Sequence, residues 1–228
     1  MIRVLVTDDE PLVRFGLRML LNTADDIDVI GEACDGTAAL ARARELAPDI
    51  VLTDLRMPGM DGITATRQLT ALPNPPAVLV LTTFDTGEGV TEALQAGAAG
   101  YLLKDAPPEQ VLSAVRLVAA GGTVLASASA ARLLESSSRA AGASRIPPEQ
   151  RRRLSMLGEQ QREILGHLGG GMSNAQIARR MYLTEGTVKA YVSRLLTTLK
   201  VENRTQAAIL AHQGGLLEEA TQGGSVSG

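Results

Sequence analysis

The chain has 228 residues, of which 45% are apolar and only 2% aromatic, so any core must be built mainly from aliphatic side chains. A single cysteine excludes an internal disulfide and fits a reducing compartment. Residues 1–126 hold nine basic and 17 acidic side chains, whereas residues 127–228 hold 13 basic and eight acidic ones. This asymmetry indicates that only the second half meets nucleic acid, and chance clustering of charge is the alternative.

The N-terminus and the hydropathy of the chain predict a cytoplasmic protein. Acidic side chains at positions 8–10 interrupt the apolar stretch that a signal peptide would need. No run approaches the roughly 18 apolar residues that a membrane span requires. We therefore expect no membrane partner.

The first 120 residues alternate short β-branched runs with amphipathic stretches. Strands are predicted at residues 2–7, 27–33, 50–54, 77–83 and 99–103, and helices near residues 11–22, 36–47, 62–72, 87–97 and 107–120. The strands are apolar on both faces, which is typical of a parallel sheet covered by helices on both sides. Five such units predict an α/β doubly wound five-stranded parallel sheet, whose ligands bind beyond the carboxyl ends of the strands. Cys34, just after the second strand, is expected to be a buried small residue.

Side chains suited to phosphoryl transfer follow four of these strands. Asp8 and Asp9 come after the first strand, and Asp54 ends the third. Thr82 and Lys104 close the fourth and the fifth. Carboxylates that converge need a cation or a proton between them, and hard oxygen ligands suit Mg²⁺. The set predicts phosphoryl transfer onto Asp54, with the cation and the lysine neutralising the phosphoryl oxygens. The alternative, that each acid merely caps a helix or ends a strand, is the better explanation for Asp8 taken alone.

The pattern changes after residue 120. We predict a linker over residues 121–155, with a short helix around 128–135, a helix-turn-helix domain over 156–217 and a disordered tail over 218–228. The Arg151–Arg153 run falls in this linker. A solvated linker is favoured there over an arm that contacts DNA.

Helix N-cap residues divide the C-terminal part of the chain into short helices. Ser173 and Gln176 form a capping box that begins a helix over residues 174–181. Thr184 then caps a helix over residues 185–199. Two capped helices separated by a few residues are typical of a helix-turn-helix.

The second of these helices combines an apolar stripe with a polar face. Small, hydroxyl and basic residues on the polar face would let it approach base edges in the major groove, and they include Thr187, Lys189, Ala190, Ser193 and Arg194. The alternative for an amphipathic basic helix is a solvated surface. The preceding capped helix favours DNA binding.

The N-terminal motifs resemble the receiver domain of two-component response regulators. They are DD at 8–9, DLRMPGMDG at 54–62, TT at 82–83 and YLLKD at 101–105, and the resemblance covers about residues 1–120. It implies that Asp54 accepts phosphate from a histidine kinase and that Asp9 and Asp54 bind Mg²⁺ directly. It also implies a water-mediated role for Asp8 and adds the backbone carbonyl of Arg56 as a ligand.

The same resemblance assigns roles to the last two strands. Thr82 and Tyr101 resemble the switch pair, in which the hydroxyl moves to the phosphate and the ring packs inward behind it, while Lys104 would contact the phosphate. Many receivers have proline after this lysine, but here Asp105 follows it. This departure leaves open whether the 104–105 peptide is cis.

The segments GMSNAQIA and GTVKAYVSRLL resemble the LuxR-type DNA-binding domain, over about residues 155–217. The combination with a receiver is that of NarL/FixJ-type response regulators. The resemblance implies four helices and points to Lys189 on a phosphate or base, and to Ala190 and Ser193 at the groove floor. Arg204 would lie near the DNA backbone or brace the fold. The usual histidine of the third helix is Tyr191 here.

These observations predict a phosphorylation-gated transcription regulator with Mg²⁺ as its cofactor. Phosphorylation of Asp54 would free the DNA-binding helix or join two chains into a homodimer on promoter DNA, with RNA polymerase as a further partner. No turnover on an external substrate is expected. One rival is a phosphotransferase or phosphatase-like enzyme that uses Asp54 on a small molecule. The other is a constitutive DNA-binding protein whose first domain only docks other proteins.

Overall fold

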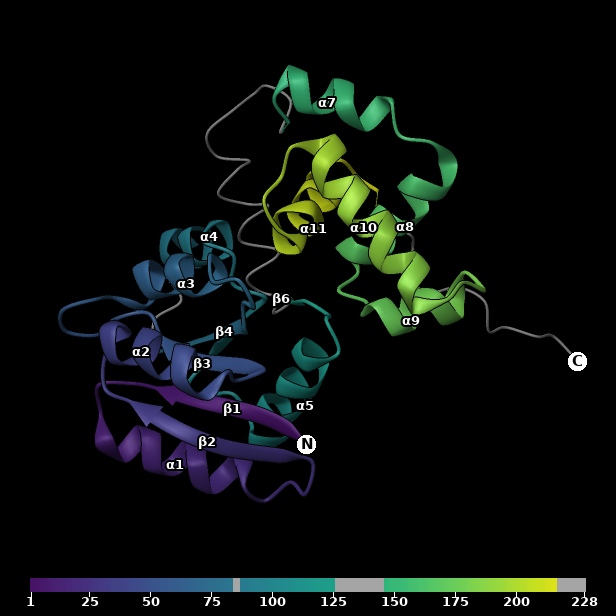
Figure 1. The fold of residues 1–228 in the computed structure, drawn as a ribbon. Coiled ribbons are helices and arrows are strands. Elements are labelled where there is room, and N and C mark those ends of the chain that lie inside the picture. Colours follow the sequence, from purple (N-terminus) through teal and green to yellow (C-terminus); the bar gives the residue numbers. More distant parts are fainter. Residues whose placement is uncertain (84–86, 126–145, 217–228) are drawn as a thin grey trace, which may run out of the picture. The chain divides into compact units, whose positions relative to one another are not determined.

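A computed structural model of the chain divides into two compact units, Met1–Arg139 and Ala140–Gly228. The structure describes residues 1–83, 87–125 and 146–216 (Figure 1). The helix predicted at 128–135 and the tail predicted at 218–228 lie outside these residues. Within the described parts of the chain, no helix is both long enough and apolar enough to cross a membrane.

The first unit contains a parallel sheet, and its strands follow the sequence prediction closely. The sheet has the order β2-β1-β3-β4-β5-β6. The five predicted strands are confirmed as β1 (Ile2–Thr7), β2 (Ile27–Ala33), β3 (Ile50–Asp54), β4 (Ala77–Thr82) and β5 (Gly100–Leu103). A sixth strand, β6 (Val124–Leu125), was not predicted, because two residues are too short to show a periodic pattern.

Helices cover both faces of this sheet (Figure 1). They are α1 (Pro11–Leu21), α2 (Gly36–Leu46), α3 (Gly62–Thr70), α4 (Gly87–Gln95) and α5 (Pro108–Ala119). Residues of α1 and α5 share one apolar core with alternate residues of β1, β3, β4 and β5. The helices α2, α3 and α4 contact one another in sequence on the other face. The doubly wound α/β prediction is therefore confirmed.

Local sequence explains where these helices begin. Asp35 and Asp61 each accept a hydrogen bond from a backbone N–H in the first turn of α2 and α3. Proline occupies the first turn of α1 and of α5, where its missing N–H is not needed. Cys34 corrects one prediction: it is exposed, because it follows the last residue of β2 and lies beside the helix cap, where its Sγ is 3.5 Å from Asp35 Oδ2.

Strand β6 lies against β5 at the edge of the sheet. The Val124 N–H donates to the carbonyl oxygen of Ala99 at 3.0 Å, and Gly100 and Tyr101 pair with Val124 and Leu125. A Cβ at Gly100 would lie 2.7 Å from the Val124 Cβ. The close pairing therefore needs glycine at position 100.

In the second unit, every helix or strand that the structure describes between residues 146 and 216 is a helix. This unit contains α7 (Pro148–Ser155), α8 (Glu159–Gly169), α9 (Asn174–Arg180), α10 (Glu185–Leu199) and α11 (Arg204–Gln213). One aliphatic core joins these helices, and fully buried members include Ile164, Leu165, Leu168, Ile177, Val188, Leu195 and Leu199. The predicted helix-turn-helix corresponds to α9 and α10.

Helix α7 corrects the predicted linker over residues 121–155. Leu154 and Ile146 are buried in the core of the second unit. Arg153 donates to the carbonyl oxygen of Leu199 at 3.3 Å and pairs with Glu149 at 3.0 Å. The residues before Met156 therefore pack with the helical domain. The basic composition of this segment concealed the helix, because few of its side chains are apolar.

Candidate functional site

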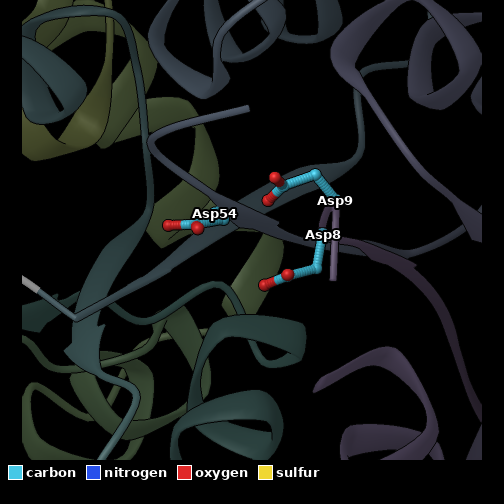
Figure 2. A group of neighbouring side chains, drawn as sticks. All are labelled: Asp8, Asp9 and Asp54. Carbon is cyan, nitrogen blue, oxygen red and sulfur yellow. The ribbon is translucent and has the colours of Figure 1, made fainter. Parts of the chain in front are cut away.

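Three carboxylates lie together at the carboxyl ends of strands β1 and β3, where the order of the strands in the sheet reverses. Strand β1 lies between β2 and β3, so the carboxyl ends of β1 and β3 flank the point at which the strand order reverses, the usual ligand position in such folds. Asp8 and Asp9 follow β1 and Asp54 ends β3, and each offers a carboxylate oxygen within 4.8 Å of the others (Figure 2). Asp8 and Asp54 are buried and Asp9 is half-buried. The structure thus brings together the three acids that the sequence placed at these strand ends.

Lys104 is paired with two of these acids. Its Nζ lies 2.6 Å from Asp8 Oδ2 and 2.8 Å from Asp54 Oδ2. Burial lowers the pKa of the ammonium, but hydrogen bonds and charge attraction from Asp54 and Asp8 outweigh this effect, so its pKa is raised above the usual value. Lys104 is therefore held protonated between Asp8 and Asp54.

The main chain also positions the carboxylates. Asp54 Oδ1 accepts a hydrogen bond from the Leu55 N–H at 2.7 Å, and Asp8 Oδ1 accepts one from the Glu10 N–H at 3.0 Å. Both oxygens of Asp8 are thus engaged within the chain, one by Glu10 and one by Lys104. No residue type signals a main-chain donor, so sequence reasoning missed the Leu55 N–H.

The cluster has the composition of a divalent-cation site. Three carboxylates face one ammonium, so the negative charge is not balanced by the nearby lysine. Two oxygens bound to one Mg²⁺ at about 2.1 Å lie at most about 4.2 Å apart. The observed spread of up to 4.8 Å is slightly wider. Both oxygens of Asp8 and both oxygens of Asp54 already accept hydrogen bonds within the chain, so the composition of the cluster suits Mg²⁺ but these contacts do not rank the three acids as ligands.

Two further predicted residues lie on the neighbouring strands. Thr82 ends β4 and is buried, and its carbonyl oxygen accepts the Lys104 backbone N–H at 2.8 Å. Tyr101 on β5 is 1% exposed, and burial raises its pKa to about 12. Its neighbour Leu102 belongs to the core shared with α1 and α5, so the tyrosine points to the opposite face of the sheet.

The remaining predicted residues of this site lie in the loops after β3 and β5. Arg56 is exposed, two residues beyond Asp54. The peptide bond between Lys104 and Asp105 is trans. The sequence had left open whether this bond is cis, because Asp105 stands where many receivers have proline.

Gly62 allows α3 to begin in direct contact with the end of β3. A Cβ on this residue would lie 1.9 Å from the Asp54 carbonyl oxygen. The Gly62 N–H also donates to the Leu55 carbonyl oxygen at 2.9 Å. Sequence reasoning missed this contact, although a glycine directly after a capping aspartate, Asp61, is the signal that could have indicated it.

The polar face predicted for α10 is open to solvent. Ser173 and Gln176 form the predicted capping box of α9, and Thr184 caps α10 by accepting the Thr187 N–H at 3.2 Å. Val188, Val192, Leu195 and Leu199 are buried, as the apolar stripe predicted. The exposed residues on the other face include Lys189, Ala190, Ser193 and Arg194, while Thr187 is half-buried.

Arg204 takes part in a brace within the helical domain. It lies at the start of α11, where its guanidinium donates to Asn174 Oδ1 at 2.6 Å and to the carbonyl oxygen of Met172. Burial lowers its pKa to about 10. Of the two roles that the sequence left open for Arg204, these contacts support bracing of the turn before α9.

Comparison with known families matches the two units separately. Residues 4–116 match the response regulator receiver domain, and residues 155–211 match the bacterial regulatory proteins of the luxR family. The first match contains all the residues of the acidic cluster and Lys104. The second contains α9 and α10.

Individual relatives match almost the whole chain. The transcriptional regulatory protein LnrK of Bacillus subtilis is 42% identical over 217 residues, which are 95% of this chain and 99% of LnrK. The nitrate/nitrite response regulator NarL of Escherichia coli is 38% identical over 210 residues, covering 92% of this chain and 94% of NarL. A crystal structure of ChrA, from a heme-sensing two-component system, is 39% identical with a TM-score of 0.52 and covers 95% of this chain and 98% of that one. This chain therefore belongs to the two-component response regulators that join a receiver domain to a LuxR-type DNA-binding domain.

Proposed function

We propose that a histidine kinase phosphorylates Asp54 and that this modification controls promoter binding by the helical domain. The observation that carries the proposal is the convergence of Asp54 with Asp8, Asp9 and the Lys104 ammonium at the ends of three strands. A buried carboxylate beside a cation and a lysine is suited to attack phosphorus, because both positive charges offset the charge on the phosphoryl oxygens.

The transfer would form an Asp54 Oδ–P bond and break the P–N bond of a phosphohistidine. The electron pair of that bond and a proton go to the departing imidazole. Mg²⁺, when bound by Asp9 and Asp54 with help from Asp8 and the Arg56 carbonyl, supplies positive charge to the phosphoryl oxygens. Lys104 already contacts Asp54 Oδ2 at 2.8 Å, so its ammonium needs only a small movement to bind the phosphoryl group.

Phosphorylation would change the balance of contacts at the ends of β4 and β5. The phosphoryl group adds negative charge and acceptor oxygens next to Lys104 and near the end of β4, where Thr82 lies. Movement of the Thr82 hydroxyl towards it would rearrange the contacts at the end of β4, and the ring of Tyr101 is already buried in the unmodified chain. We propose that this two-state surface governs release of α10 or formation of a homodimer.

A homodimer would bind two half-sites, so the promoter element should be roughly palindromic. The exposed face of α10 would enter the major groove, with Ala190 and Ser193 at its floor and the Lys189 ammonium on a backbone phosphate. Such binding takes place in the cytoplasm of a bacterium, and RNA polymerase is the natural further partner of a promoter-bound regulator.

The test combines phosphorylation with DNA binding. The full chain is incubated with Mg²⁺ and a small phosphodonor, modification is located by mass spectrometry, and binding to DNA fragments selected from the genome is measured with and without the donor. We expect Asp54 to be modified and binding to strengthen, and Asp54→Ala to abolish both effects. Asp28→Asn is the matched control, because Asp28 is exposed near the start of β2, away from the carboxyl ends of the strands.

Two outcomes would refute parts of the proposal. Equal DNA affinity with and without modification would exclude control by phosphorylation and favour a constitutive DNA-binding protein. Steady turnover of an added phosphoester, lost in Asp54→Ala, would favour the enzyme alternative. We expect instead a single phosphoryl group per chain, released only to water.

A further inference from the structure

Tyr182 occupies an unusual position in the turn between α9 and α10. Its side chain is 95% exposed, and its backbone has φ +56°, in the left-handed region. A bulky side chain is disfavoured in that region, where glycine and asparagine fit with less strain. A glycine or asparagine at this position of the turn would therefore adopt the same backbone conformation with a lower conformational free energy.

The exposure of Tyr182 is also unfavourable, because a large aromatic ring is left in water in a chain that has few aromatic side chains. The whole chain holds three tyrosines, two phenylalanines and no tryptophan. Of the other two tyrosines, Tyr101 is buried, and Tyr191 packs on the core of its unit and donates its hydroxyl to Gln160 Oε1 at 2.7 Å. Tyr182 contributes little packing to the fold. A strained and exposed aromatic residue is best explained by a ligand that covers it.

The surroundings of Tyr182 indicate the chemistry of that ligand. Arg179 and Arg180 end α9 just before the turn, and with Met172 and Gln176 they line an open hollow of about 380 Å³. Thr184 caps α10 two residues after Tyr182. Along the chain, the turn thus follows two arginines and precedes a helix with an exposed polar face. This combination suits a polyanion such as the nucleic-acid backbone.

We propose that Tyr182 is a sequence-independent DNA contact, with its ring against a deoxyribose and its hydroxyl donating to a backbone phosphate. The inference rests on the proposed function, in which α10 enters the major groove. In a helix-turn-helix the first helix crosses the backbone while the start of the second reaches the bases, so the connecting turn lies beside the sugar-phosphate chain. Tyrosine is among the residues that make such backbone contacts.

The test measures binding of the full chain to a selected genomic fragment and to duplex DNA of mixed sequence, with the phosphodonor present. Tyr182→Phe removes only the hydroxyl and should weaken binding to both DNAs by about twofold to tenfold. Tyr182→Asn keeps a residue that tolerates the left-handed backbone but removes the ring, and should weaken binding by roughly tenfold or more without lowering the melting temperature. Tyr191→Phe is the control, because that hydroxyl is used within the fold; it should leave both affinities unchanged.

Two further readouts separate this contact from a general loss of charge or structure. Tyrosine is neutral, so both Tyr182 variants should keep the wild-type salt dependence, whereas Lys189→Gln should reduce the slope by about one. Nitration of Tyr182 by tetranitromethane should be suppressed by saturating DNA, while any nitration of Tyr191 is not.

Unchanged affinity in Tyr182→Asn, or equal nitration of Tyr182 with and without DNA, would overturn the proposal. If Lys189→Gln still weakened binding in that case, the proposed function would stand and only the contact would be lost. If the wild-type chain bound neither DNA, the proposed function itself would fail.

Discussion

Gly62→Ala tests whether α3 must begin in direct contact with the strand that carries Asp54. The added Cβ would lie 1.9 Å from the Asp54 carbonyl oxygen and 2.9 Å from its carbonyl carbon. Both are main-chain atoms, so no side-chain rotation can relieve the overlap, and either α3 or the end of β3 must move. Overpacking of this kind typically costs about 1–3 kcal/mol of unfolding free energy. The movement would also displace the Asp54 carboxylate.

The expected result is a less stable receiver that is phosphorylated more slowly. For a unit of this size, 1 kcal/mol corresponds to about 3–4 °C in melting temperature, so the receiver transition should fall by roughly 3–12 °C. Thermal unfolding of the full chain followed by far-ultraviolet circular dichroism measures the shift. Mass spectrometry after incubation with a small phosphodonor and Mg²⁺ measures the rate of modification.

Gly16→Ala is the matched control for this substitution. Gly16 is exposed within α1 and a Cβ there would meet nothing within 4 Å. The same chemical change should therefore stabilise the receiver by about 0.5–1 kcal/mol through helix propensity. If Gly62→Ala raised the melting temperature as Gly16→Ala does, the close contact between α3 and β3 would not exist and the reasoning would be refuted.

Three other predictions concern the cluster and the helical domain. Asp54→Asn should raise the melting temperature of the receiver in metal-free buffer, because it removes one of three converging charges, and should reduce the further rise that Mg²⁺ produces; a lower melting temperature would contradict this. Leu154→Ala should lower the unfolding free energy of the helical domain by about 2–4 kcal/mol in urea titrations, because Leu154 is buried, whereas an independent linker would show no change. Burial lowers the pKa of His212 below its usual 6.5 against an opposing hydrogen bond with the Gly169 backbone, so the unfolded chain binds the proton more readily. Stability of the helical domain should therefore fall as pH drops below about 6.5 in melts at several pH values, and His212→Gln should reduce this dependence.

The sequence predicted those features that depend on periodicity and on strand ends. Apolar runs located the five main strands, and Asp54 and Lys104 could be placed at one edge because carboxyl ends of parallel strands meet there. Capping residues located α9 and α10, with Ser173 and Thr184 at the predicted positions. These signals are local, so a single sequence contains them.

The features that sequence reasoning missed depend on contacts between distant residues. The bonds from Arg204 to Asn174 and Met172 join α11 to the turn before α9, and nothing in the local pattern distinguishes such an arginine from one that binds phosphate. Helix α7 escaped prediction because Leu154 is one apolar residue among arginines. In the sequence, Gly62 looks like an ordinary first residue of a helix. Only the structure shows that the Asp54 carbonyl oxygen lies too close to allow a side chain there.

The pairing of β6 with β5 makes the outer edge of the sheet depend on one glycine. Val124 and Leu125 are aligned with Gly100 and with Tyr101, the residue predicted to take part in the switch. A Cβ at position 100 would lie 2.7 Å from the Val124 Cβ and 3.0 Å from the Val124 carbonyl oxygen, so a larger residue would push Val124 off the edge. A substitution at Gly100 would therefore expose the backbone of β5, the strand that contains Tyr101, before any phosphate is transferred.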